Sequence, residues 1–210
     1  MTASKTFNNL SEIKKHLFLE QAYQEFAFHD YESASITHLV KELGIAKGSV
    51  YQYFKDKQTL YEHLLSHAYN TLEELTAQAC PIRGDDDFFD WFTRYLIVQT
   101  KFQLSFPLYA LLFQHIDKRT EPETINIHKE IESRWENDLI INYPTSLSDS
   151  HQYTSFLASI PRIMFRQLVQ LHEIDLLPNT QQPLAIDIEG QIIVDYCTRW
   201  TSMIKKGIPI

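Results

Sequence analysis

Residues 35–54 read Ser35-Ile-Thr-His-Leu-Val-Lys-Glu-Leu-Gly44-Ile-Ala-Lys47-Gly-Ser-Val-Tyr-Gln-Tyr-Phe54. Ser35 is a good helix N-cap, because its hydroxyl can accept from the free amides of the first turn. Gly44 follows the last apolar residue of this helix, where a left-handed backbone costs glycine little. Val50 and Phe54, four residues apart, give a second helix one buried side. The pattern predicts a helix-turn-helix, which presents its second helix to the major groove of DNA.

The outer side of the second predicted helix carries the residues suited to DNA. They are Lys47, Gly48, Ser49, Gln52 and Tyr53. Lysine and glutamine can donate to base edges, serine and tyrosine hydroxyls can reach phosphate oxygens, and glycine permits close approach of the backbone. Lys57 opens the next helix and has two interpretations. A docked phosphate would offset its unfavourable position in the helix dipole, whereas residue type alone favours a solvated lysine.

The run from Leu43 to Phe54, followed by Lys57 and Leu60, resembles the TetR family of bacterial transcriptional regulators. The resemblance extends back through the apolar stripe of the preceding helix and covers the chain up to about residue 65. Two positions depart from the family pattern. Asp30 replaces a common glycine, and Thr37 replaces a longer basic side chain.

The resemblance implies a DNA-binding role for particular residues. Base edges or the groove floor would be met by Thr37, Lys47, Gly48 and Ser49. Phosphates would be held by Ser35, Tyr51, Gln52, Tyr53 and Lys57. It also implies a homodimer formed through the last two helices, and repression of a double-stranded DNA operator that ends when a small-molecule effector binds.

The fold class that follows is all-α, with about nine helices. A three-helix helix-turn-helix DNA-binding domain is expected at 1–56, and a larger helical ligand-binding and dimerisation domain at 57–210. Only five glycines, and no regular alternation of apolar and polar residues, argue against an extensive sheet. Expected helices cover 57–79, a segment opened by Asp85–Asp87, 108–118, 121–143, 149–171 and 184–206, with a bend at Pro161 and a loop at 178–183.

Charge and composition constrain the class of protein. The chain has 210 residues, 44% apolar content and a formal net charge of −8, which is ordinary for a cytoplasmic protein and suggests no membrane partner. Lysines and carboxylates nearly cancel within 1–63, whereas a DNA-binding domain is usually basic. The lysines nevertheless cluster around the predicted helix-turn-helix. We therefore expect modest non-specific affinity for DNA and a shallow dependence on salt.

Aromatic residues are dense between Phe88 and Phe113, and ligand pockets are largely apolar. This pattern favours a small hydrophobic or aromatic effector, although for any single residue a plain aromatic core is the favoured explanation. The candidate ligand-binding residues are Trp91, Tyr95, Phe102, Phe106, Tyr109, Phe165 and Arg166.

Two stripes of apolar residues at fourfold spacing lie near the C-terminus. They suit either a four-helix dimer interface or ordinary core, and the family resemblance favours the interface. The candidate interface residues are Phe156, Ile160 and Met164 on one helix, and Ile188, Ile192, Tyr196 and Trp200 on the other.

An enzyme is not expected, because the chain has no nucleophile elbow, phosphate-binding glycine loop, zinc-protease motif or spaced cysteine quartet. These absences also predict no cofactor and no metal. His63 and His67 have metal-ligand spacing but suit a helix-surface pair better. Cys80 and Cys197 are expected to be reduced and structural. The alternative function is a helical dimer that binds a ligand or a protein without binding DNA specifically.

Overall fold

The computed structural model describes residues 3–81, 83, 87–116, 124–142, 151–174 and 188–207. These residues form ten helices, and none of them forms a strand. The all-α fold is therefore confirmed. The expected helix starts at Asp85 and 121, the ends at 118 and 143, the start at 149 and the loop at 178–183 lie outside the described residues.

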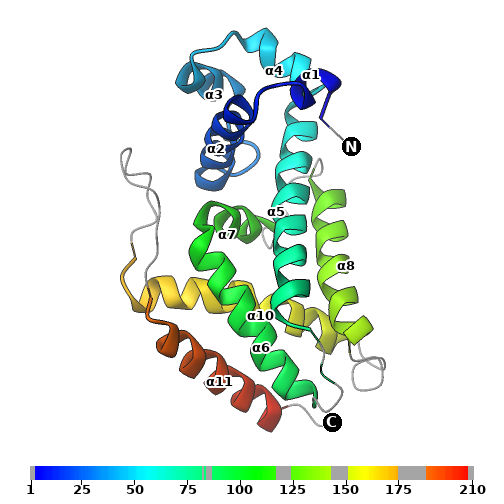
Figure 1. The fold of residues 1–210 in the computed structure, drawn as a ribbon, viewed down its shortest axis with the longest axis vertical. Coiled ribbons are helices and arrows are strands. Elements are labelled where there is room, and N and C mark those ends of the chain that lie inside the picture. Colours follow the sequence, from blue (N-terminus) through cyan, green and yellow to red (C-terminus); the bar gives the residue numbers. More distant parts are fainter. Residues whose placement is uncertain are drawn as a thin grey trace.

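Four helices and the start of a fifth make the upper part of the molecule (Figure 1). They are α1 (Lys5–Asn8), α2 (Glu12–Phe28), α3 (Ile36–Leu43), α4 (Lys47–Tyr53) and α5 (Lys57–Ala79). We call α1–α4 with the first turns of α5 the head. Its core is aromatic, since Phe7, Phe18 and Phe54 lie with ring centroids 5.0–5.8 Å apart.

The remaining helices form the body, which lies below the head in Figure 1. They are α6 (Phe88–Ser105), α7 (Pro107–Gln114), α8 (Ile125–Asn142), α10 (His151–Leu171) and α11 (Gly190–Gly207). The lower part of α5 packs against α6, α7 and α8, and α6 also contacts α10 and α11. Head and body meet mainly where α2 packs on α7.

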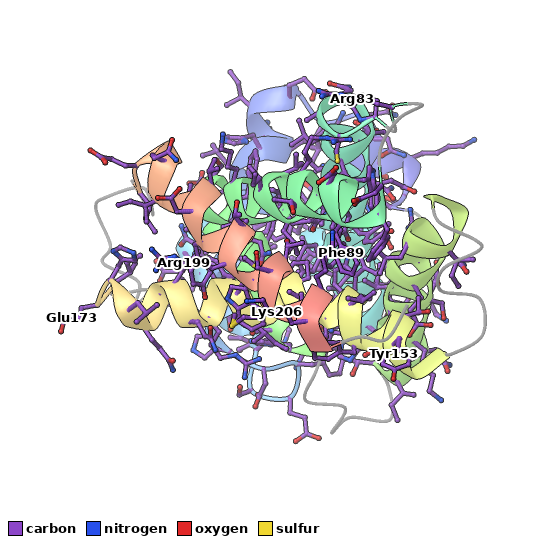
Figure 2. All side chains as sticks on the ribbon, turned by 90° about the horizontal axis from the view of Figure 1, so that it is seen from below. Arg83, Phe89, Tyr153, Glu173, Arg199 and Lys206 are labelled. Atoms are coloured by element: carbon purple, nitrogen blue, oxygen red, sulfur yellow. The ribbon has the colours of Figure 1, made fainter. Side chains whose placement is uncertain are left out.

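Helices α10 and α11 close the end of the molecule that is farthest from the head (Figures 1 and 2). Several large apolar side chains on these two helices remain exposed in the single chain. They are Tyr153, Phe156, Leu171, Ile192 and Met203, which are 40–69% exposed. Apolar surface gathered on one end of a monomer is a common mark of an interaction site.

Among the described residues, no single helix is both long and apolar enough to cross a membrane. The consecutive helices α6 and α7 meet the length and composition criteria only when taken together, and a bend of 106° separates them.

Candidate nucleic-acid interface

The α3–α4 turn has the local geometry that its sequence predicts. The hydroxyl of Ser35 accepts a hydrogen bond from the amide of His38 at 3.2 Å and so caps α3. Gly44 adopts the left-handed conformation at φ 63°. Val50 and Phe54 are buried, with exposed fractions of 2% each. Because the apolar side of α4 packs into the core of the head, its opposite side is exposed to solvent.

That outer side contains most of the residues that sequence analysis assigned to DNA. Thr37, Lys47, Gly48, Tyr51 and Gln52 are exposed, and Ser35, Ser49, Tyr53 and Lys57 are half-buried. The Lys47 ammonium donates to the Thr37 hydroxyl at 3.0 Å, so the two helices present one continuous polar surface. We call Thr37, Lys47, Gly48, Tyr51 and Gln52 the α4 surface.

Gly48 has no packing role within the protein. A Cβ atom built on it would meet no other atom within 4 Å, and its backbone is helical. We expect Gly48→Ala to raise the free energy of unfolding by up to about 1 kcal/mol, since alanine favours a helix over glycine. The same variant should weaken operator binding, because the new methyl group occupies the space of a close DNA contact. Thermal unfolding and a DNA titration measure the two effects separately, and unchanged DNA affinity would exclude close approach at Gly48.

Lys57 has internal partners in the structure. Its ammonium donates to the backbone carbonyl of Glu32 at 3.0 Å and lies 4.7 Å from the centre of the Tyr31 ring. It therefore does not extend freely into solvent. The neighbouring Asp56 caps α5 through the Thr59 hydroxyl and amide, at 2.7 Å each. Both hydrogen bonds lower the pKa of Asp56, and the bond from the Thr59 hydroxyl contributes more than the bond from the Thr59 amide.

A buried carboxylate that the sequence pattern did not predict holds the start of α3. Glu25 on α2 is only 4% exposed. Its side chain accepts from the Ser35 amide at 2.6 Å and contacts the Nδ1 atom of His38 at 2.6 Å. The only hint in the sequence is an acidic residue next to Phe26 on the buried side of a helix. Its partners lie ten and thirteen residues further along the chain, so local periodicity could not identify them.

The N-terminal segment also supports the second helix of the motif, and sequence analysis expected no element there. The Ser4 amide donates to the Tyr53 carbonyl at 2.9 Å, and its hydroxyl donates to the Gln52 carbonyl at 2.6 Å. These bonds satisfy carbonyl groups at the C-terminal end of α4 that have no partner inside the helix. Phe7 then anchors α1 against the ring of Tyr53, with ring centroids 5.8 Å apart.

His63 and His67 lie at the joint between head and body. The hydroxyl of Tyr23 is 2.9 Å from His67 Nδ1, and the Tyr23 ring packs on Tyr109 with centroids 4.4 Å apart. Burial, reinforced by the nearby His67, lowers the pKa of His63 to about 4. Within the described part of the chain, no three His, Cys, Asp or Glu side chains gather as a metal site.

The predicted ligand-binding residues are divided between the packed core, the head–body joint and the surface. Trp91, Tyr95, Phe102 and Phe165 are at most 3% exposed and belong to the packed core. Tyr109 lies at the head–body joint, and Phe106 and Arg166 are exposed. The aromatic-core alternative accounts for the first four. Aromatic density could not separate the two interpretations, because core and pocket use the same side chains.

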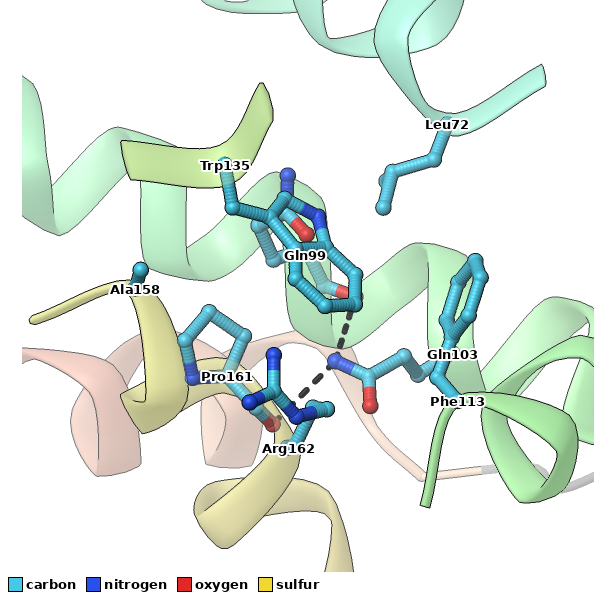
Figure 3. Close-up of a pocket in the computed structure, with 8 residues that line it drawn as sticks. All are labelled: Leu72, Gln99, Gln103, Phe113, Trp135, Ala158, Pro161 and Arg162. Carbon is cyan, nitrogen blue, oxygen red and sulfur yellow. Dashed lines mark hydrogen bonds between the residues drawn. The ribbon is translucent and has the colours of Figure 1, made fainter. Parts of the chain in front are cut away.

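Two adjoining cavities lie elsewhere in the body. The outer one lies between α8 and α10, and the inner one is also lined by residues of α5, α6 and α7. The inner one has a volume of about 10 Å³ and is lined by Leu72, Gln99, Gln103, Phe113, Trp135, Ala158, Pro161 and Arg162 (Figure 3). The outer one has a volume of about 260 Å³ and is lined by Glu132, Trp135, Glu136, Ser155, Ala158, Ser159 and Arg162. None of the seven predicted ligand-binding residues lines either cavity.

The predicted interface residues divide between surface and core. Phe156 and Ile192 are exposed, and Ile188, Tyr196 and Trp200 are half-buried. Ile160 and Met164 have no exposed surface and pack inside the chain, so they cannot contact a partner in this conformation. The reason is geometric. Residues four apart on a helix are rotated by about 40°, so a fourfold stripe turns gradually from the surface to the core.

A compact head that exposes one polar helix of a helix-turn-helix, joined to a helical body, defines a class of DNA-binding proteins. Residues 18–64 match the family model described as bacterial regulatory proteins, tetR family. The head therefore belongs to the TetR family, and the whole chain has the fold of TetR-family transcriptional regulators.

Solved structures extend the likeness over the body. A TetR family transcriptional regulator from Chloroflexus aurantiacus J-10-FL has a TM-score of 0.74 at 23% identity, covering 99% of this chain and 98% of that chain. A putative tetR family transcription regulator from Shewanella sp. PV-4 has a TM-score of 0.64 at 16% identity, covering 90% and 95%. The fatty acid degradation regulator FadR from Bacillus halodurans has a TM-score of 0.62 at 14% identity, covering 92% and 96%. No curated protein matches this chain in sequence.

Proposed function

We propose that the protein is a homodimeric, ligand-responsive transcriptional regulator, and that it represses transcription until a small hydrophobic or aromatic effector releases it from its operator. The α4 surface carries the DNA-binding part of the proposal. The α4 surface is exposed and belongs to a TetR-family head. It also contains Gly48, next to Lys47, and packing within the protein does not require a glycine there. Thr37, Lys47, Gly48 and Ser49 are proposed to meet base edges, and Ser35, Tyr51, Gln52, Tyr53 and Lys57 to meet phosphates.

The division of labour follows the fold. We propose a DNA-binding domain at 1–56 and a ligand-binding and dimerisation domain at 57–210, with α5 beginning at their boundary. The exposed apolar residues of α10 and α11, including Phe156 and Ile192, are proposed to pack against their symmetry mates. Because α5 runs from the head into the body, where it packs on α6, α7 and α8, helix movement in the body would change the spacing of the two heads.

The proposed mechanism is a shift between two conformers. Two heads read major grooves about one helical turn apart, roughly 34–36 Å. An effector that binds better to a conformer with another head spacing shifts the population toward it and lowers operator affinity. The packing of α2 on α7 gives the body a direct contact with the head through which this change can pass.

The test is a titration of the full-length protein against the promoter region next to its own gene, with a random duplex of the same length as control. Sequence-selective binding by a dimer, measured by gel shift and light scattering, is the expected result. The logarithm of the binding constant should fall linearly with the logarithm of the salt concentration, with a slope of about −0.9 for each phosphate neutralised. A near-neutral head neutralises few phosphates, so we expect a shallow slope. Equal affinity for both duplexes would overturn the proposal.

A second candidate function is a helical dimer that binds a ligand or a protein but no specific DNA sequence. The observation that favours it is the near balance of lysines and carboxylates in residues 1–63. Selective operator binding in the same titration would exclude this candidate.

A further inference from the structure

The outer cavity between α8 and α10 is lined mainly by polar side chains, so it differs from a purely hydrophobic pocket. The outer cavity, of about 260 Å³, is somewhat smaller than pockets for drug-sized ligands, which are roughly 300–1,000 Å³. The inner cavity, at about 10 Å³, admits no more than one water. Trp135, Ala158 and Arg162 line both, so the two cavities adjoin across these side chains. A small ligand in the outer cavity would therefore contact the side chains that separate it from the inner cavity.

A buried glutamine side chain lines the inner cavity. Gln103 on α6 is 2% exposed, and its amide nitrogen donates to the carbonyl groups of Pro161 at 3.1 Å and Gln99 at 3.4 Å (Figure 3). These two acceptors fix the orientation of the amide, because a flipped group would bring oxygen against oxygen. The Oε1 atom of Gln103 is then buried without a hydrogen-bond partner among the described residues. A buried acceptor of this kind favours a ligand with an N–H or O–H donor.

The charges around the outer cavity favour a cation. Glu132 and Glu136, one turn apart on α8, are half-buried and line it together with Arg162. Among the described residues that line it, two carboxylates and one guanidinium give a net charge of −1. The hydroxyl of Ser155 donates to Glu136, so its single hydrogen is already engaged within the wall. An anionic ligand would have to approach both carboxylates in a partly desolvated site.

The face of Trp135 already binds a flat cation. The guanidinium of Arg162 lies 4.4 Å from the centre of the indole ring, and Figure 3 shows it beneath that ring and beside Gln103. Arg162 is only 5% exposed, so this contact is shielded from water, where cation–π attraction is strongest. The indole N–H of Trp135 also lacks a partner among the described residues, so a ligand acceptor or an accompanying water suits it.

We propose that the effector is a small, flat organic cation rich in N–H donors, such as an aromatic amidine or guanidine. It competes with Arg162 for the face of Trp135, donates to the carboxylates of Glu132 and Glu136, and reaches toward Gln103 Oε1. Arg162 lies on α10, which also carries exposed Phe156, so displacing the arginine acts on the helix proposed to set the head spacing. This inference rests on the proposed function, because it names the chemical class of its effector.

Three probes of the same shape test the sign of the charge. Benzamidine, benzamide and benzoate carry one ring each and charges of +1, 0 and −1 near neutral pH. Calorimetric titration of the full-length dimer should show benzamidine binding at least tenfold more tightly than benzamide, and no binding of benzoate. Equal affinities, a preference for benzoate, or no binding of benzamidine would overturn the inference.

Variants locate the site, and a DNA titration tests its role. Replacing both carboxylates, Glu132→Gln with Glu136→Gln, should weaken benzamidine binding at least tenfold. Glu130→Gln on the same helix is the matched control, because Glu130 is exposed and lines neither cavity. Unchanged benzamidine affinity in the double variant would place the probe elsewhere and overturn the site.

Benzamidine should also release the wild-type protein from its operator, and binding without release would overturn the effector role. Operator binding measured without any probe separates the two proposals. If the operator is bound selectively but the probes fail, only the cationic effector is rejected, whereas loss of selective DNA binding rejects the regulator itself.

Discussion

Lys47→Ala should weaken operator binding by roughly thirtyfold or more while the protein stays folded and dimeric. Lys47 is exposed at the first position of α4, and its ammonium donates a 3.0 Å hydrogen bond to Thr37 on the surface of α3. Losing one good base contact costs roughly 1–3 kcal/mol, and a dimer loses it in both heads. The combined loss of about 2–6 kcal/mol corresponds to a fall in affinity of roughly thirtyfold or more.

The control for this variant is Lys206→Ala. Lys206 is an exposed lysine near the end of α11, far from the head (Figures 1 and 2), so the change in net charge is the same. Its operator affinity should stay near the wild-type value. Thermal unfolding and light scattering of Lys47→Ala should match the wild type, because no buried group is removed. Operator binding at wild-type strength by Lys47→Ala would show that α4 does not enter the groove at this residue.

The tyrosine at the end of α4 needs a gentler substitution. Tyr53→Ala would remove a ring that packs on Phe7 and Phe18, with centroids 5.8 and 5.6 Å apart, so lost DNA binding could reflect a damaged head. Tyr53→Phe keeps the ring and removes only the hydroxyl that is proposed to reach a phosphate.

Glu25→Ala should cause the largest loss of stability, and the loss should be confined to the head. The carboxylate is 4% exposed and accepts from the Ser35 amide and contacts His38, both at 2.6 Å. A hydrogen bond to a charged group contributes about 1.5–3 kcal/mol, and the variant also leaves the Ser35 amide without its acceptor. We expect a loss of about 3 kcal/mol or more, and a fall in melting temperature of roughly 6–12 °C for a protein of this size.

Two companion variants make this prediction specific. Glu25→Gln keeps an oxygen for the Ser35 amide but removes the charge, so its loss should be smaller. Glu20→Ala removes an exposed carboxylate from the same helix, whose nearest ionic contact is His16 at 3.9 Å, and should leave stability almost unchanged. Equal melting temperatures for Glu25→Ala and Glu20→Ala would mean that Glu25 does not hold the start of α3.

Local sequence predicted the head well, because its signals lie within a few residues of one another. The Ser35 cap, the left-handed Gly44 and the Asp56 cap each depend on atoms at most four residues away. The helix of 57–79 was predicted with the bounds that α5 has in the structure. By contrast, Glu25, Ser4 and the α1 helix contact residues that are distant in sequence, so no periodic pattern could predict these contacts.

The body shows the opposite balance. Its apolar stripes predicted helices correctly, yet could not tell that Ile160 faces the core while Phe156 faces solvent. That distinction depends on which helices pack on each side of α10, and the aromatic residues of α6 raise the same difficulty. The outer cavity takes Glu136, Trp135 and Arg162 from two helices, and the adjoining inner cavity also takes Gln103 from a third.

The amino-acid sequence by itself determined the helices, the glycine turn and the polar outer side of α4, because hydrogen bonding and capping act between neighbours along the chain. Tertiary structure alone decided which apolar residues became core, which stayed on the surface of α10 and α11, and where buried polar groups lacked partners. Those outcomes follow from packing between segments far apart in sequence, where each side chain has several possible neighbours and only the complete fold selects among them.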